Sequence, residues 1–239
     1  MNSGKSLLFK GNHYINDFIK IKIPTVGEIL DDEDEYYSLI SVFTAMPIDM
    51  MVQLDDIGID FTTINDYEMF LIFFGAIQSA DTSLIFEDLD LKNFRIEKNP
   101  QNGLPWIIDK EHDIKIDRAL HGQISDFLRK LHGITKNTRK PANKEAQDFM
   151  IERARKKILR QKRKADSSQL EPLITALVNT EQYKYDFEGT RELSIYQFNE
   201  SVRQVIKKVD YDNKMIGVYT GNLNAKELSQ DDINWLIHK

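Results

Sequence analysis

The densest run of apolar residues lies between Asn65 and Ser79. Its apolar positions repeat at helical spacing on one face and continue on the other: Tyr67, Met69, Phe70, Leu71, Ile72, Phe73, Phe74 and Ile77. Asn65 and Glu68 have the spacing of a capping box, and Gly75 would let a neighbouring backbone approach closely. The apolar run is about eight residues long, against the roughly twenty that a membrane span requires. We therefore predict a core helix that is covered on every side.

The first part of the chain predicts helices and a few short strands. Alternating residues from Phe18 to Ile23 predict a half-buried strand that ends at Pro24. Helical spacing, caps and the turn-forming sequence 99–103 predict the rest: helices 34–45, 47–58 and 118–132, a β-hairpin of 91–96 with 104–108, and a short third strand 114–116. Asp117 would cap the helix 118–132, and Gly133 stands where a left-handed glycine ends a helix.

The second part of the chain predicts helices alone. A polar stretch from Thr135 to Asn143 separates it from the first part and predicts a boundary. The helices expected after it are 143–164, which has a basic surface, 170–178, 192–209 with a Ser194–Gln197 capping box, 211–219, and 231–237 capped by Ser229. The predicted fold is mainly α with a small β-hairpin or sheet (α+β) and two helical lobes. Residues 1–134 would form an N-terminal α+β lobe around the central helix, and residues 143–239 a C-terminal helical lobe that begins with the basic helix.

Composition fits an ordinary globular protein, with 239 residues, 41% hydrophobic residues and a net charge of −6. The chain has no cysteine, which excludes disulfides and thiolate metal sites and suits a reducing cytoplasm. The first thirty residues contain no long apolar segment, so no secretion signal is predicted.

The charge is unevenly distributed along the chain. Residues 136–164 contain twelve Lys and Arg against three Asp and Glu, a net +9, so the remaining residues carry −15. An acidic cluster, Glu28 with Asp31 to Glu35, lies at the other extreme. Such asymmetry suggests a charged partner or a self-complementary assembly.

No residue pattern indicates catalysis, a cofactor or a metal. Gly4-Lys5-Ser6 lacks the earlier glycine and the strand of a phosphate-binding loop, and His121 and His132 are too far apart on one helix to share an ion. Two weaker candidates are a carboxylate cluster around His112 and a calcium-loop lookalike at 210–213; the first comprises Asp109, Glu111, His112, Asp113 and Asp117. A solvated turn with a helix cap explains the cluster better. We expect no enzymatic activity, and an enzyme with an unrecognised site is the less favoured alternative.

The basic helix is the remaining candidate site. Its cations are expected to contact a partner or phosphates: Arg153, Lys156, Lys157, Arg160, Arg163 and Lys164. The helix lacks interleaved aromatic residues on which bases would stack, and a basic run is often only a solvated face. A nucleic-acid-binding accessory protein that uses the basic helix 144–164 is therefore the second hypothesis.

Two groups of segments resemble proteins encoded in the tail gene clusters of tailed phages of Gram-positive bacteria. In the second part these are 193–205, 211–228 and 233–236, and in the first part 36–45 and 53–60. The resemblance implies a tail or baseplate morphogenesis protein, either an assembly chaperone or a component of the baseplate hub. It implies other tail or baseplate proteins as partners, with a homo-oligomer as a further option, no membrane, and a location in the host cytoplasm during assembly or in the virion tail. It implies no catalytic residues.

Overall fold

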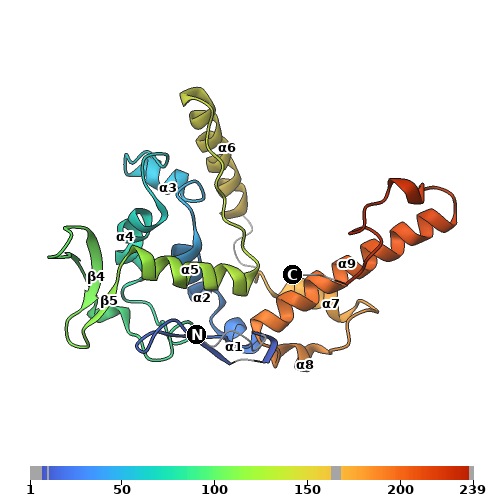
Figure 1. Cartoon of the computed structure of the whole chain (residues 1–239), viewed down its shortest axis with the longest axis horizontal. Coiled ribbons are helices and arrows are strands. Elements are labelled where there is room, and N and C mark those ends of the chain that lie inside the picture. Colours follow the sequence, from blue (N-terminus) through green and yellow to red (C-terminus); the bar gives the residue numbers. More distant parts are fainter. Residues whose placement is uncertain (1–6, 10, 163–167, 237–239) are drawn as a thin grey trace.

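The computed structural model describes residues 7–9, 11–162 and 168–236. These residues form a mainly helical α+β fold with two small antiparallel sheets, as the sequence predicted (Figure 1). The helices are α1 (Val26–Asp31), α2 (Glu33–Thr44), α3 (Met51–Asp56), α4 (Asp66–Ile77), α5 (Arg118–His132), α6 (Lys144–Lys162), α7 (Glu171–Val178), α8 (Phe187–Arg191) and α9 (Ile195–Tyr219). Short 3-10 turns lie at Leu7–Phe9, Leu91–Asn93 and Ala225–Glu227.

The two sheets are both antiparallel and are built from short strands. β1 (Asn12–Tyr14) pairs with β2 (Lys20–Lys22), and the second sheet has the order β3 (Arg95–Lys98), β4 (Pro105–Asp109) and β5 (Ile114–Ile116). Ile107 on the middle strand lies opposite Ile96 and Ile116, and Ile107 and Ile116 are fully buried. The predicted hairpin and third strand are confirmed. The hairpin starts later than predicted because Leu91–Asn93 form a 3-10 turn.

Helices α2, α4 and α5 pack against one another around the main hydrophobic core. Phe43 of α2 and Phe70 of α4 are both fully buried, with ring centroids 5.1 Å apart. The predicted capping box of α4 is present: Glu68 accepts from the Asn65 backbone N–H and donates its own backbone N–H to the Asn65 side chain. Each helix in the described part of the chain is too short or too polar to span a lipid bilayer.

The prediction that α4 is covered on every side is wrong. Ile72 is 37% exposed, and Gly75 and Ala76 are exposed beside it. No atom lies within 4 Å of the place where a side chain on Gly75 would begin, so no neighbouring backbone approaches there. α4 is covered on the sides that face α2 and α5, and Met69 is buried in the cluster with α3 and α6, but no described element packs over the side that carries Ile72. The close approach occurs instead at Gly27 of α1, where an added Cβ would lie 3.2 Å from the Arg191 carbonyl oxygen.

Helices α6 and α9 project from the main core in different directions (Figure 1). α9 runs without a break from Ile195 to Tyr219, so the prediction of two helices here is wrong. The ion pairs Lys208–Asp212 and Lys214–Asp210 bridge successive turns across the supposed junction and support one continuous helix. The helix predicted at 231–237 is also wrong for its described residues, which form turns and coil from Asp231 to Leu236, and Ile237 lies outside the described residues.

The polar stretch 135–143 contains no helix or strand, but residues beyond it pack with residues before it. The backbone N–H of Val26 donates to the Leu193 carbonyl oxygen at 2.8 Å, and that of Ile195 donates to the Pro24 carbonyl oxygen at 2.8 Å. Leu170, Ile174 and Leu177 contribute to the same hydrophobic core as α2, α4 and α5. The division into lobes 1–134 and 143–239 stays a prediction, since the contacts of this structure do not separate the chain there.

Candidate functional site

The cations of α6 lie along a groove that we call the basic groove. It has a volume of about 1060 Å³ and lies between α6, the start of α3 and the segment 137–140. Its lining residues are Ile48, Met51, Asn137, Arg139, Lys140, Met150, Arg153, Ala154, Lys156, Lys157 and Arg160. Six of these side chains are cationic, none is acidic, and Ile48, Met51, Met150 and Ala154 form an apolar floor.

One side of α6 fixes the helix to α3. Ile151 is 7% exposed and belongs to a small hydrophobic cluster that includes Val52 and Leu54 of α3. Arg155 forms ion pairs of 2.6 Å with both Asp55 and Asp56 at the end of α3. Near the other end of α6, the Gln147 side chain donates to Asp60 at 2.8 Å. These contacts hold α6 in one orientation, so its cations line the groove in a defined row.

The row consists of Arg153, Lys157 and Arg160. Their spacing of i, i+4 and i+7 places them on one face of α6, and Met150 and Ala154 separate this face from the one that packs on α3. All three side chains are exposed, and none forms an ion pair with any described residue. Lys156, in contrast, pairs with Glu152 at 2.5 Å. The row therefore presents cations whose charge no described carboxylate neutralises.

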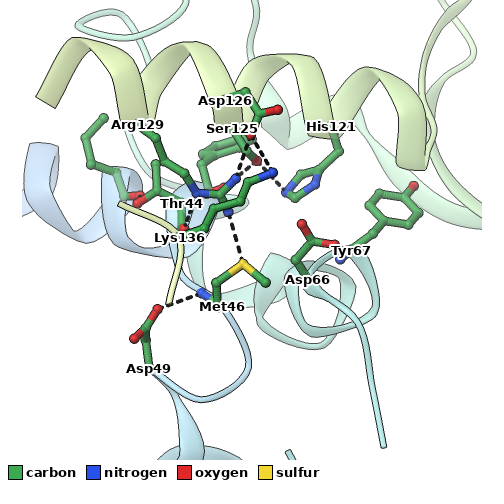
Figure 2. A network of polar contacts seen from close by, with 12 residues as sticks. Thr44, Met46, Asp49, Asp66, Tyr67, His121, Ser125, Asp126, Arg129 and Lys136 are labelled. Carbon is green, nitrogen blue, oxygen red and sulfur yellow. Dashed lines mark hydrogen bonds and ion pairs between the residues drawn. The ribbon is translucent and has the colours of Figure 1, made fainter. Parts of the chain in front are cut away.

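The opposite wall of the groove depends on a polar network beneath it (Figure 2). Arg129 of α5 is 3% exposed and donates through Nε to the Thr44 carbonyl oxygen at 2.9 Å. Ser125, one turn earlier, donates to the Phe43 carbonyl oxygen at 2.6 Å. The last carbonyls of a helix lack partners within the helix, and a cation is favourable near them. Ser125 and Arg129 thus bind the C-terminal end of α2 and set the direction in which the chain leaves it.

The network continues into the groove wall itself. Asp126 binds both Arg129 at 3.0 Å and Lys136 at 2.7 Å, which attaches the start of the segment 137–140 to α5. Asn137 donates to Asp49 Oδ1 at 2.9 Å, and Asp49 Oδ2 accepts from the Met46 backbone N–H at 2.9 Å. Burial opposes ionisation of Asp126, but the hydrogen bonds from Lys136 and Arg129 lower its pKa. Arg139 and Lys140 consequently face the groove from a fixed segment.

His121 and Ser125 lie close together in this network but are not arranged for nucleophilic catalysis. The His121 Nε2 atom is 3.3 Å from Ser125 Oγ, while the Ser125 hydroxyl already donates to a carbonyl. Both side chains are at most 2% exposed, and His121 Nδ1 is buried with no hydrogen-bond partner. Burial lowers the pKa of His121 to about 4, so the ring is neutral near neutral pH. Both side chains are part of the protein interior and are not accessible to a substrate.

The structure brings four of the six predicted site residues together and leaves two undescribed. Arg153, Lys156, Lys157 and Arg160 line the basic groove, whereas Arg163 and Lys164 lie outside the described residues. Sequence reasoning missed the other side of the groove, formed by Asn137, Arg139, Lys140, Ile48, Met51 and Met150. The available signal was that Arg139 and Lys140 belong to the same basic stretch as the helix.

The carboxylate cluster is a structural turn, as the sequence favoured. Asp109 is 3% exposed and accepts from the Glu111 backbone N–H at 2.9 Å and from His112 Nδ1 at 2.7 Å. Burial opposes its ionisation, but these hydrogen bonds lower the pKa of Asp109, and Asp109 in turn raises the pKa of His112. Asp113 has a left-handed φ of 53° in the turn, and Asp117 caps α5.

Other sequence candidates add no site. The described part of the chain contains no group of three His, Asp or Glu side chains that could hold a metal ion. Residues 210–213 lie within α9 and form no calcium loop. Gly4, Lys5 and Ser6 lie outside the described residues.

A second cavity of about 670 Å³ lies between α4, α5 and the β3–β4 hairpin. Its walls include Trp106 and Leu104, with Asn65, Glu68 and Asp117 among the polar lining. Those three polar side chains are engaged in capping α4 and α5. The cavity therefore offers mainly apolar surface, and three of its polar side chains serve the helix ends.

A comparison with protein families finds a match in the C-terminal part of the chain. The family model described as the YomV second domain matches residues 161–238, which include α7, α8 and α9. The family is phage-associated, and the match indicates a phage protein. No curated protein and no solved structure matches the chain. The match begins just after Arg160 and leaves the basic groove outside the family model.

Proposed function

We propose that this phage protein is a non-enzymatic tail or baseplate assembly protein that acts through protein–protein contacts, as a structural component or as an assembly chaperone. The basic groove is the observation that supports this proposal. It combines cations that have no described acidic partner with an apolar floor, as a binding surface for a protein does. Its partners would be other tail or baseplate proteins, met in the host cytoplasm during assembly or retained in the virion tail.

The composition of the groove favours protein over nucleic acid. Nucleic acid is bound through phosphates and, in single strands, through bases stacked on aromatic rings. Among the described lining residues there is no aromatic side chain, and Ile48, Met51 and Met150 occupy the floor. An apolar floor contributes little to a phosphate backbone but matches the apolar side chains of a protein.

Nucleic-acid binding is the second candidate, and the unpaired row of Arg153, Lys157 and Arg160 supports it. These cations could follow a backbone of phosphates without using the floor. Each neutralised phosphate would then add about −0.9 to the slope of log affinity against log salt concentration. A steep slope separates this mode from a contact that also buries apolar surface.

The test is a charge reversal at Arg153→Glu and Arg160→Glu, studied in the full chain. Co-purification with the tail proteins of the source phage, identified by mass spectrometry, should be lost. The matched control, Lys98→Glu with Lys130→Glu, changes two exposed lysines that do not line the groove and should retain the co-purification. Mass spectrometry of purified particles separates a virion component from a chaperone. Retained co-purification, together with salt-sensitive DNA binding that the reversal abolishes, would support the nucleic-acid candidate instead.

A further inference from the structure

The basic groove carries positive charge on both sides of an apolar strip. Arg153, Lys157 and Arg160 form one border on α6, and Arg139 and Lys140 form the other on the segment 137–140. Met150 and Ala154 of α6 lie between the borders, with Met51 and Ile48 facing them from the start of α3. A complementary ligand must therefore carry an apolar strip with negative charge on both of its sides.

We propose that the occupant of the basic groove is an acidic amphipathic helix of a partner protein, with a row of apolar side chains bordered on both sides by Asp or Glu. This inference rests on the proposed function, in which the groove binds protein. An amphipathic helix has the required pattern, since apolar residues at i, i+3, i+4 and i+7 make a strip flanked by polar positions. A strand alternates its side chains between two faces and cannot flank one apolar row in this way.

The spacing along α6 supports a helical occupant. Arg153 and Arg160 are seven positions apart, which is about 10.5 Å along the axis at 1.5 Å per residue. A partner helix lying along α6 repeats its carboxylates at the same interval when they occupy i, i+4 and i+7. Two turns of such a helix would meet the whole described row.

The floor suits apolar side chains of different shapes. Met51 and Met150 contribute flexible thioether side chains, which adapt to the ligand they contact. A purely acidic segment would pair with the row but would not cover the floor, because it leaves the apolar strip exposed to water. The combination of charge and apolar contact distinguishes the proposed helix from both a polyacid and a phosphate backbone.

The acidic cluster of a second copy of this chain is a poor occupant, because four of its six carboxylates are already engaged, among them Glu35, which accepts from the Asp81 backbone N–H at 2.8 Å. Glu33 accepts from the Gln169 and Leu170 backbone N–H groups at 2.7 and 3.0 Å. Asp31 pairs with Arg191 at 3.0 Å, and Glu28 pairs with Lys22 at 2.7 Å. Docking these groups in the groove would require breaking contacts within the fold, so the partner is a different protein.

The experiment measures binding of labelled synthetic peptides to the full-length protein by fluorescence anisotropy. The test peptide is a 21-residue helix with Leu at i, i+3, i+4 and i+7 of each repeat and Glu at the flanking positions. Three probes accompany it: the same peptide with Lys for Glu, a Glu/Ala helix without the apolar row, and a 20-base-pair DNA duplex. The acidic amphipathic peptide should bind at least about tenfold more tightly than each of these, a difference of about 1.4 kcal/mol.

Variants of the protein assign the binding to the groove. Arg153→Glu with Arg160→Glu should lower the affinity for the acidic peptide by at least about tenfold. Met150→Gln should lower the same affinity by a smaller factor of about three. The Lys98→Glu with Lys130→Glu control should leave the affinity for the acidic peptide unchanged. A common midpoint of urea unfolding shows that all variants fold.

Other outcomes overturn the inference. Equal binding of the Glu/Ala helix shows a charge-only surface, tighter binding of DNA supports the nucleic-acid candidate, and no binding of the acidic peptide excludes the proposed occupant. If the acidic peptide does not bind while tail proteins still co-purify in a groove-dependent manner, the proposed function is retained. Only the proposed chemistry of the partner is then wrong.

Discussion

The two projecting helices, α6 and α9, differ in whether their exposed rows of cations are paired with carboxylates. On α9, Lys208 pairs with Asp212 at 2.5 Å, and Lys214 pairs with Asp210 at 2.7 Å and Asp232 at 2.6 Å. On α6, the row of Arg153, Lys157 and Arg160 has no described carboxylate partner. Hydrogen bonds to Asp210 and Asp232 raise the pKa of Lys214, which shows how closely the charges of α9 are matched. A cation on α9 is part of the fold, whereas a cation in the α6 row is available to a ligand.

Both helices bury apolar side chains at their anchor and leave others exposed. α6 buries Ile151 against α3 and leaves Phe149 and Leu159 64% and 62% exposed. α9 buries its first turn and leaves Ile206, Ile216 and Tyr219 63%, 60% and 85% exposed. The segment after α9 covers another side of that helix, where Gln204 donates to the Trp235 carbonyl oxygen at 2.7 Å. The difference teaches that projection alone does not identify a binding helix. The pairing state of the charges and the coverage of the apolar side chains must be read together.

The largest effect is expected from a substitution that removes the buried anchor of α9. Phe198 is fully buried in the first turns of the helix, so Phe198→Ala should leave a cavity and lower the free energy of unfolding by about 3 to 5 kcal/mol. Ile206→Ala, two turns further along, should change it by no more than about 0.5 kcal/mol. Urea denaturation of both variants checks the contrast. Equal effects at the two positions would show that the projecting part of α9 is covered by another surface in solution.

A pH titration perturbs the hydrophobic core around α5 without changing the charge of the lysines and arginines on α6 and α9. Burial lowers the pKa of His121 and of His132 to about 4, against ordinary values near 6.5. Between these values the unfolded chain binds protons that the folded chain does not, so stability should fall as pH falls from about 6.5 toward 4. For His121, which is 2% exposed, the shift corresponds to a loss on the order of 3 kcal/mol.

The measurement is the urea midpoint between pH 4 and pH 7 for the parent protein, His121→Gln and His112→Gln. His121→Gln should flatten the pH dependence, because it removes a group that the folded state keeps neutral. His112→Gln should leave that dependence largely in place, since Asp109 raises the pKa of His112 rather than lowering it. A titration curve identical for all three proteins would contradict the burial of His121.

A smaller effect is expected at the anchor of α6. Ile151 is 7% exposed in a small cluster near the surface, so Ile151→Ala should cost about 2 kcal/mol, at the lower end for a buried isoleucine. Leu159→Ala, at a position that is 62% exposed on the same helix, should have almost no effect. Hydrogen exchange should show faster opening of α6 in the Ile151 variant than of α5. Uniform acceleration across the chain would mean that α6 is more tightly coupled to the main core than its contacts suggest.

The smallest effect on stability should come from the row itself. Arg160→Ala removes an exposed side chain without a described ion pair, so the free energy of unfolding should stay within about 0.5 kcal/mol of the parent value. The same substitution should weaken groove-dependent binding, which is measured separately. A clear loss of stability would show that Arg160 supports the fold, and the contrast between the row and the paired lysines of α9 would disappear.

The sequence by itself determined the features that depend on neighbours a few positions apart. The capping boxes at Asn65 and Ser194 and the cap at Asp117 all involve hydrogen bonds spanning three residues. Gly133 has the predicted left-handed backbone, with a φ of 65°. Such geometry follows from local chemistry, because the partner groups are brought together by the helix turn itself. The basic character of α6 could also be predicted from the sequence, since the net charge of a segment depends only on its composition.

Only the tertiary structure decided which faces are covered and what the cations face. Every position of α4 that is apolar in the sequence could be buried, yet Ile72 is exposed because no described element packs on that side. The basic helix became one wall of a groove because Ile151 and Arg155 dock it on α3, and because Asp126 of α5 holds the opposite wall through Lys136. These contacts join residues up to a hundred positions apart, such as Arg155 with Asp55. Local periodicity carries no information about such pairs, since they form only when separate elements pack together.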